Sequence, residues 1–421
     1  MINLNNNGVN IIQLQQQSKI RFDVKLPLIL IHTPFGLKFF DKVARTRVAK
    51  YYAKFTTYLM PIITALAFFL IIGGIIALFA NPVAREGSRA IGPQSNLLIP
   101  GLNPYLPIAD GWIALIIAMV VHEAGHGIVA RVHDVKVEST GIVLLFILPI
   151  GAFVNIEKEE LDKISLKHKS SILTAGITTN IIFAGISLFF IFLITSSLNV
   201  VQPATPSTFG VEITDVTQQS LAQNLGLTKG SIIQQIQNKE IKTPTQLNGN
   251  LSANLGNTIS ITWLNDKGQK ITKQTTLPKE RTLGKGILGV AIIEVADPQK
   301  VLNTYNTLFV SNPLVLLAPP TIAQGIVPFS SLMQEKYSSS VLGSYFAPPA
   351  NLLFWIWFIN FNVAIFNALP IGPFDGGQLY DSIIDKRTEN KKGIIKNASK
   401  ILSIGTIIVI ALAFVIPWLM R

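Results

Sequence analysis

Five long apolar stretches are the feature that most constrains how this chain can fold. A helix needs about 20 residues to cross the hydrocarbon core of a bilayer, and its backbone polar groups must be satisfied within the segment. With 49% hydrophobic and 14% charged residues, the 421-residue chain is predicted to be an α-helical polytopic membrane protein. The predicted spans are 57–80, 111–131, 171–196, 350–371 and 401–420.

Basic residues flank these stretches in a pattern that predicts their orientation. Cytoplasmic loops carry an excess of lysine and arginine, and the loop after the second span and the segment 385–400 are both basic. The N-terminus is therefore predicted to be cytoplasmic and region 198–349 extracytoplasmic. The cations before the first span are Lys38, Lys42, Arg45, Arg47, Lys50 and Lys54.

The net charge of +12 is attributed to contact with the lipid bilayer, and nucleic acid is not expected as a partner. No cysteine is present, which excludes disulfides and thiolate metal ligands. The oligomeric state has no signal in the sequence.

The domain order follows from the spans and from a change in composition between the third and the fourth. Region 205–297 is rich in Thr, Gln and Asn, with short alternating runs that are typical of a small β-rich domain inserted into the helical protein. Prolines interrupt 306–328, which is predicted to be interfacial or re-entrant. The predicted order is a basic cytoplasmic segment 1–56, a first part of the transmembrane core 57–200, the β-rich domain 205–297, a linker 298–349 and a second part of the core 350–421.

The β-rich region resembles a PDZ domain. In the stretch 220–241 a short helix is followed by Gly226, Gly230 and a strand from Ser231 to Gln237, and the stretch 243–257 would supply the second helix. A small β domain of another kind, serving as a spacer, is the alternative.

The second span ends in VHEAGHGIVA, which brings ionisable groups into an apolar helix. Residues i and i+4 share a helix face, so His122 and His126 can present both imidazoles to one metal ion, with Glu123 placed as a general base. A match to HExxH alone can arise by chance, because only three of its five positions are fixed. Ionisable groups within a span cost roughly 3 kcal/mol each, however, and usually mark function.

A catalytic zinc ion normally has three protein ligands and an open position for water. His133 follows His126 by a separation of about 10 Å along a continuous helix, which is too far to share the metal. Asp375, in FNALPIGPFDGGQL, is the better candidate, because it is the single acidic residue between Glu335 and Asp381 and the neighbouring prolines and glycines break the helix. Taken alone, this segment is better explained as a loop with an ordinary aspartate. Irregular backbone at membrane depth is tolerated only where it lines an enclosed or wet cavity.

The motifs HEAGH and NALPIGPFDGG together resemble the site-2 protease family of intramembrane zinc metalloproteases, whose paired motifs are HExxH and NxxPxxxxDG. The similarity extends to the archaeal, PDZ-containing members and includes TAGITTN at 174–180. Three positions depart from the family pattern: Phe374 stands where leucine is common, Ile177 replaces a proline, and Asn155 stands where relatives tend to carry glutamate.

The resemblance implies a zinc cofactor and a role for each residue of the site. Glu123 would activate water for the hydrolysis of peptide bonds within or next to transmembrane segments of other membrane proteins, as in regulated intramembrane proteolysis. Asn367 and Asn180 would lie near the substrate or the oxyanion. The implied zinc ligands are His122, His126 and Asp375.

The segment 139–155 alternates partly like a strand and is too short and too interrupted to cross the membrane. A hairpin at membrane depth could pair with an unwound substrate by strand addition, with Gly151 in contact with it. Two other classes of function are the alternatives: a proteolytically inactive scaffold that binds partners through the PDZ-like domain, and a metal-binding or transport protein. The intact motif argues against the first, and the glutamate beside the histidines has no evident use in the second.

Overall fold

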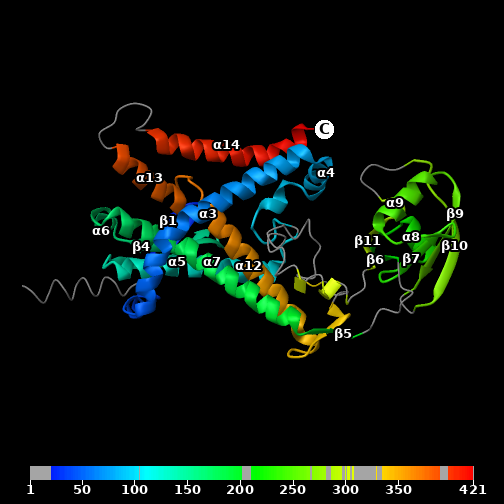
Figure 1. Ribbon diagram of the computed structural model, residues 1–421, viewed down its shortest axis with the longest axis horizontal. Helices are drawn as coiled ribbons and strands as arrows, with labels where there is room; N and C mark the ends of the chain where they lie inside the picture. The colour runs from blue at the N-terminus through cyan, green and yellow to red at the C-terminus, as the bar shows by residue number, and fades with distance from the viewer. Residues whose placement is uncertain are drawn as a thin grey trace, which may run out of the picture. The chain divides into compact units, whose positions relative to one another are not determined.

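The computed structural model describes residues 20–103, 105–201, 210–265, 268–280, 286–295, 334–388 and 397–420, with a few further residues between 299 and 329 (Figure 1). The chain divides into two compact units. Among the described residues, the first unit contains those up to Ile191 and those from Pro349 onward, and the second contains those from Phe192 to Pro348, apart from 320–323.

Five helices of the described chain are long and apolar enough to cross a membrane, as predicted. The predicted re-entrant segment 306–328 lies outside the described residues, except for 306 and 307. The five are α3 (Arg47–Ala80), α5 (Ile108–Val132), α7 (Leu166–Ser196), α12 (Ala347–Asn367) and α14 (Ala398–Leu419).

All five helices differ from the predicted bounds by at least one residue, and for two of them the sequence supplies the physical reason. Helix α3 begins at Arg47 rather than 57, because the Thr46 side chain caps it by accepting a hydrogen bond from the Ala49 amide at 3.2 Å. Helix α12 ends at Asn367 rather than 371. Pro370 lacks an N–H group and disfavours helical backbone at the residue before it, so the chain leaves the helix there.

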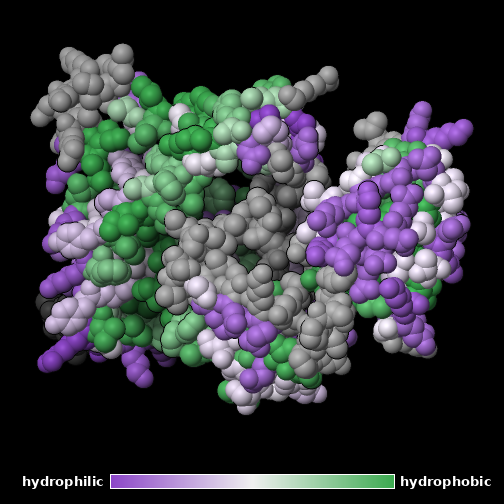
Figure 2. All heavy atoms as spheres, turned by 45° about the vertical axis from the view of Figure 1, so that its right-hand side comes forward, coloured by the Kyte–Doolittle hydropathy of each residue, from purple (hydrophilic) through white to green (hydrophobic). Residues whose placement is uncertain are grey.

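Large apolar side chains remain exposed along the long helices, for example Phe69 in α3, Phe189 in α7 and Ile408 in α14. Figure 2 shows hydrophobic residues gathered over the helical unit, whereas hydrophilic residues dominate the visible face of the β domain. Exposed apolar area of this extent is what a lipid-facing surface requires. The short helices of the helical unit are α2 (Leu37–Ala44), α4 (Pro82–Ile91), α6 (Lys158–Lys163) and α13 (Asp375–Thr388).

A four-stranded antiparallel sheet of order β1-β2-β3-β4 belongs to the helical unit. Strands β3 (Val137–Leu145) and β4 (Leu148–Ile156) form the hairpin that was predicted at 139–155. Strands β1 (Arg21–Lys25) and β2 (Leu28–Thr33) extend this sheet and were not predicted. His32 links three strands, because its ring nitrogens contact Ser139 Oγ at 3.1 Å and Asp23 Oδ2 at 3.2 Å.

The second unit contains a sheet of order β10-β9-β7-β6-β11, with β8 paired to β7. The predicted strand 231–237 and the two predicted helices are present as β7, α8 and α9, and both Gly226 and Gly230 take the left-handed backbone conformation that glycine favours. Its elements are β6 (Val211–Val216), α8 (Leu221–Leu225), β7 (Ile232–Ile236), β8 (Lys239–Glu240), α9 (Pro244–Ala253), β9 (Thr258–Leu264), β10 (Lys270–Thr276) and β11 (Val290–Glu294).

This sheet and its two helices enclose an apolar core that includes Ile213, Ile233 and Trp263. Outside it, β5 (Leu198–Val200) pairs with β12 (Tyr337–Ser339). The β5–β12 ladder joins the chain that leaves α7 to the chain that leads into α12.

Close packing of α5 against α7 depends on Gly125. A Cβ atom at this position would lie 2.3 Å from Thr179 Oγ1 and 2.7 Å from the carbonyl oxygen of Ala175. Tyr52 of α3 contacts the same two groups of α7. Its hydroxyl donates a hydrogen bond to the carbonyl oxygen of Ala175 at 2.7 Å and lies 2.6 Å from Thr179 Oγ1. Three spans therefore meet at one turn of α7.

The substitution Gly125→Ala is expected to destabilise the helical unit by ~1–3 kcal/mol, because the added methyl group would meet backbone atoms that cannot rotate away. Thermal unfolding of the detergent-purified protein measures the loss. Gly405→Ala in α14 is the matched control, since nothing lies within 4 Å of its Cβ position. An equal response of the two variants would contradict the packing role of Gly125.

Candidate metal centre and active site

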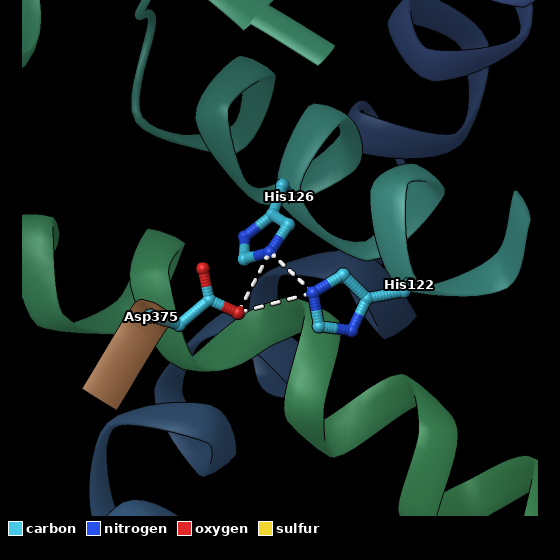
Figure 3. Close-up of side chains that lie close together, drawn as sticks. All are labelled: His122, His126 and Asp375. Atoms are coloured by element: carbon cyan, nitrogen blue, oxygen red, sulfur yellow. Dashed lines mark hydrogen bonds and ion pairs between the residues drawn. The ribbon is translucent and has the colours of Figure 1, made fainter. Parts of the chain in front are cut away.

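Two histidines of α5 and the first residue of α13 meet at one point (Figure 3). Asp375 Oδ2 lies 3.0 Å from His122 Nε2 and 3.2 Å from His126 Nε2, and the two Nε2 atoms are 3.2 Å apart. All three side chains are largely buried. The structure thus brings together the three residues that the sequence indicated as ligands.

The turn between α12 and α13 delivers Asp375 to the two histidines. Its tight course needs glycine, because a Cβ at Gly376 would lie 2.5 Å from the carbonyl oxygen of Leu369, and one at Gly377 would lie 2.1 Å from that of Ile371. The two glycines let the start of α13 pack onto the end of the turn. The irregular backbone predicted at this motif is therefore what positions the carboxylate.

The tautomer of His126 follows from its other ring nitrogen. His126 Nδ1 donates a hydrogen bond to the carbonyl oxygen of Ile172 at 2.7 Å, so Nε2 of the neutral ring carries a lone pair. A backbone acceptor of this kind orients metal-ligating histidines in general.

The donor set fits a divalent metal ion. Two imidazole nitrogens and a carboxylate oxygen that converge at 3.0–3.2 Å repel one another unless a proton or a cation lies between them. Ligands of a tetrahedral zinc ion, each at about 2.0–2.1 Å from the metal, lie about 3.3 Å apart. The observed separations are close to that value.

Gly176 of α7 makes room for both imidazoles. A Cβ atom there would lie 2.4 Å from His126 Nε2 and 2.8 Å from His122 Nε2. The backbone of α7 therefore forms one wall of the centre. Gly176 lies within TAGITTN, but the sequence predicts no role for it. A glycine within a helix does not indicate which side chains of another helix pack against it.

Glu123 is partly buried on the same helix, and its charge interacts with His126, His122 and Asp375. Its carboxyl group accepts a hydrogen bond from the backbone of Val154 in β4. The β3–β4 hairpin thus holds the side chain that was predicted to act as a base, a link that the sequence did not reveal.

The other predicted site residues lie on neighbouring elements. Asn180 is fully buried, one helical turn after Gly176, and neither atom of its amide has a hydrogen-bond partner in the described part of the chain. Asn367 is the last residue of α12, and Gly151 pairs with Val143 in the hairpin. Neither Asn367 nor Gly151 contacts the three ligands in any interaction that the described residues make.

His133, rejected as a ligand on spacing, lies apart from the centre. Its ring stacks on His168 with centroids 4.2 Å apart. Burial and the neighbouring His168 lower the pKa of His133 to about 4, so it is neutral at physiological pH.

Comparison with known proteins gives a consistent result. The model of peptidase family M50 matches residues 111–412. An uncharacterized protein of Methanocaldococcus jannaschii is 25% identical over 378 residues, which are 89% of this chain and 82% of the relative.

Two bacterial relatives carry the name "Putative zinc metalloprotease". The one from Clostridium acetobutylicum is 24% identical over 66% of this chain and 88% of its own length. The one from Clostridium perfringens is 24% identical over 63% of this chain and 84% of its own length.

The substitution Gly176→Ala is expected to lower bound metal at least tenfold, because the new methyl group would occupy the space of the two Nε2 atoms. Metal content of the purified protein, measured by elemental mass spectrometry, gives the result. Gly185→Ala, on the same helix with nothing within 4 Å, should bind as the wild type does. Full metal content in Gly176→Ala would contradict the close contact between the backbone of α7 and the two imidazoles.

Proposed function

The chain belongs to peptidase family M50, the site-2 protease family, and from this premise we propose that it cleaves peptide bonds within or next to transmembrane segments of other membrane proteins. The observation that carries this proposal is the convergence of His122, His126 and Asp375 beside Glu123 on a helix long and apolar enough to span a bilayer. A soluble substrate would not require a catalytic centre built on such a helix.

Zinc is the proposed metal, with His122, His126 and Asp375 as its ligands. Two imidazoles and a carboxylate are a ligand set of catalytic zinc sites, and they leave one position open. When bound, zinc supplies Lewis acidity that polarises water and the scissile carbonyl group. The names of the clostridial relatives support the choice of metal.

Glu123 is the proposed general base. Its carboxylate takes a proton from the attacking water and passes it to the nitrogen of the leaving amine, so that water adds across the C–N bond without a covalent enzyme intermediate. The hydrogen bond from Val154 fixes the carboxylate beside the ligands. A fixed base reduces the entropy that must be lost on reaching the transition state.

Asn180 and Asn367 are proposed to contact the substrate. The buried and unpartnered amide of Asn180 offers an N–H donor in surroundings where a hydrogen bond to a developing negative charge is strong. Unpartnered buried amides are rare and costly, which supports a partner that arrives with the substrate.

The outer edge of β4 is the proposed docking strand for the substrate. Among the described strands β4 pairs only with β3, and the interaction of the Val154 backbone with Glu123 supports an N–H group that faces away from β3. Since edge-facing groups recur every second residue, those of Ala152 also face outward. A substrate strand that pairs with this edge near Gly151 would place its following peptide bonds beside Glu123. An extended strand also exposes peptide bonds that a helix keeps hydrogen-bonded within itself.

Regulated intramembrane proteolysis is the proposed setting, with a cytoplasmic N-terminus and an extracytoplasmic PDZ-like domain. The order of α8, β7 and α9 and the two left-handed glycines support the PDZ-like assignment of 205–297. Such a domain would admit substrates already shortened by another protease.

An inactive scaffold is the alternative function. A scaffold would retain the fold and the PDZ-like domain, but it would have no use for Glu123 beside three convergent ligands. The presence of these four residues therefore argues against the scaffold.

The substitution Glu123→Gln is expected to reduce cleavage of a single-span substrate in proteoliposomes by 10²-fold or more, because the proton acceptor is lost, while bound zinc stays at the wild-type level. Quantitative gel analysis of the products measures the rate, and a chelator should abolish wild-type cleavage. If wild-type protein with full zinc cuts no substrate with a helix-breaking residue in its span, the scaffold reading is favoured.

The substitution Ala152→Pro is expected to slow cleavage at least tenfold with zinc content unchanged. Proline removes an N–H group that faces away from β3, so the hairpin keeps its ladder and the substrate loses a donor. Ala152→Val, which keeps the N–H group, serves as the control. Equal rates for the two variants would exclude pairing at this edge.

A further inference from the structure

Six exposed cations lie within residues 38–54, at the start of the first span, and they are here called the basic surface. They are carried by α2, by the link to α3 and by the first turns of α3: Lys38, Lys42, Arg45, Arg47, Lys50 and Lys54. The helical spacing is regular, because Lys38 and Lys42 are four residues apart, as are Lys50 and Lys54. All six side chains point to the outside of the helical unit.

The basic surface lacks a counter-charge within the described part of the chain, where none of the six forms an ion pair. Asp41 is the single acidic residue between Lys38 and Lys54. Its carboxylate already binds Arg131 of α5 at 3.0 Å. Six like charges within residues 38–54, without an ion pair among the described residues, are complementary to an external anion.

The length of α3 places the cations that this helix carries, Arg47, Lys50 and Lys54, at the depth of lipid headgroups. The 34-residue helix is about 51 Å long, whereas the hydrocarbon core is about 30 Å thick. The apolar residues occupy its C-terminal part, so the first turns emerge at the level of the phosphates. Lys50 and Lys54 lie in those turns.

Aromatic rings flank the cations in the way that a membrane interface favours. Phe39 of α2 and Tyr51, Phe55 and Tyr58 of α3 are each more than half exposed. Phenylalanine and tyrosine in such positions bury their rings in the interfacial region of a bilayer. An acidic protein or a nucleic acid would not need these rings at membrane depth.

The opposite face of α2 packs against the helix that carries the two histidines. Leu37, Phe40 and Ala44 are buried there, and the Phe40 ring lies over Gly127, where a Cβ would be 2.5 Å from it. Gly127 directly follows His126. An anion that holds the outer face of α2 would therefore also stabilise the packing next to the centre.

We propose that the basic surface binds the headgroup phosphates of anionic phospholipids and that this binding stabilises the packing of α2 on α5. The occupant is a lipid of the surrounding bilayer, held by unpaired cations at phosphate depth and by aromatic rings at its acyl edge. This inference goes beyond proteolysis and does not depend on it.

The test titrates the detergent-purified full chain with fluorescent short-chain phosphatidylglycerol and, separately, phosphatidylcholine at low and high salt. The wild type should bind phosphatidylglycerol at least tenfold more tightly than phosphatidylcholine, and high salt should reduce that preference. The triple variant K42Q/K50Q/K54Q should lose at least tenfold in affinity for phosphatidylglycerol. Its melting temperature should no longer rise when the lipid is added.

Two controls separate the site from a general charge effect and from misfolding. K229Q/K239Q/K270Q removes the same charge from exposed lysines of the second unit and should bind as the wild type does. The variant K42R/K50R/K54R keeps the charge and should restore binding. Equal loss in both glutamine variants, no preference for the anionic lipid, or tighter binding of an oligoglutamate peptide than of phosphatidylglycerol would each overturn the proposal.

Discussion

The close approach of α5 and α7 is the constraint on which the rest of the helical unit depends. A methyl group at Gly125 would overlap the backbone of α7, and one at Gly176 would overlap the two imidazoles of α5. The contact sets His126 against the carbonyl of Ile172, which fixes its tautomer. Without this contact the two imidazoles would have no wall to lie against, and His126 would lose the acceptor that fixes its tautomer.

Spacing rules account for what the sequence predicted well. His122 and His126 share a helix face by the geometry of any α-helix, and the paired motif indicated Asp375 as their partner despite its distance along the chain. The hairpin at 139–155 and the elements α8, β7 and α9 were likewise visible in local patterns of alternation and glycine. Each of these signals is contained within a few consecutive residues.

Contacts between distant segments account for what the sequence did not predict. Strand β2 reads as a short apolar run, and only its pairing with β3 makes it part of a sheet. The role of Gly176 exists only because another helix lies against it, and the bond between Val154 and Glu123 joins a strand to a helix. The early start of α3 was readable in principle from the Thr46 cap, but the basic residues that follow resemble a loop.

The order of the ligands along the chain has a consequence for biosynthesis. His122 and His126 are synthesised early, whereas Asp375 follows only after the third span, the whole second unit and α12. A nascent chain paused at any earlier point holds two of the three ligands and cannot complete the centre. The proposed hydrolytic activity is thereby withheld until the second unit has been synthesised and Asp375 has reached the two histidines, so a half-made chain would not cleave neighbouring proteins during membrane insertion.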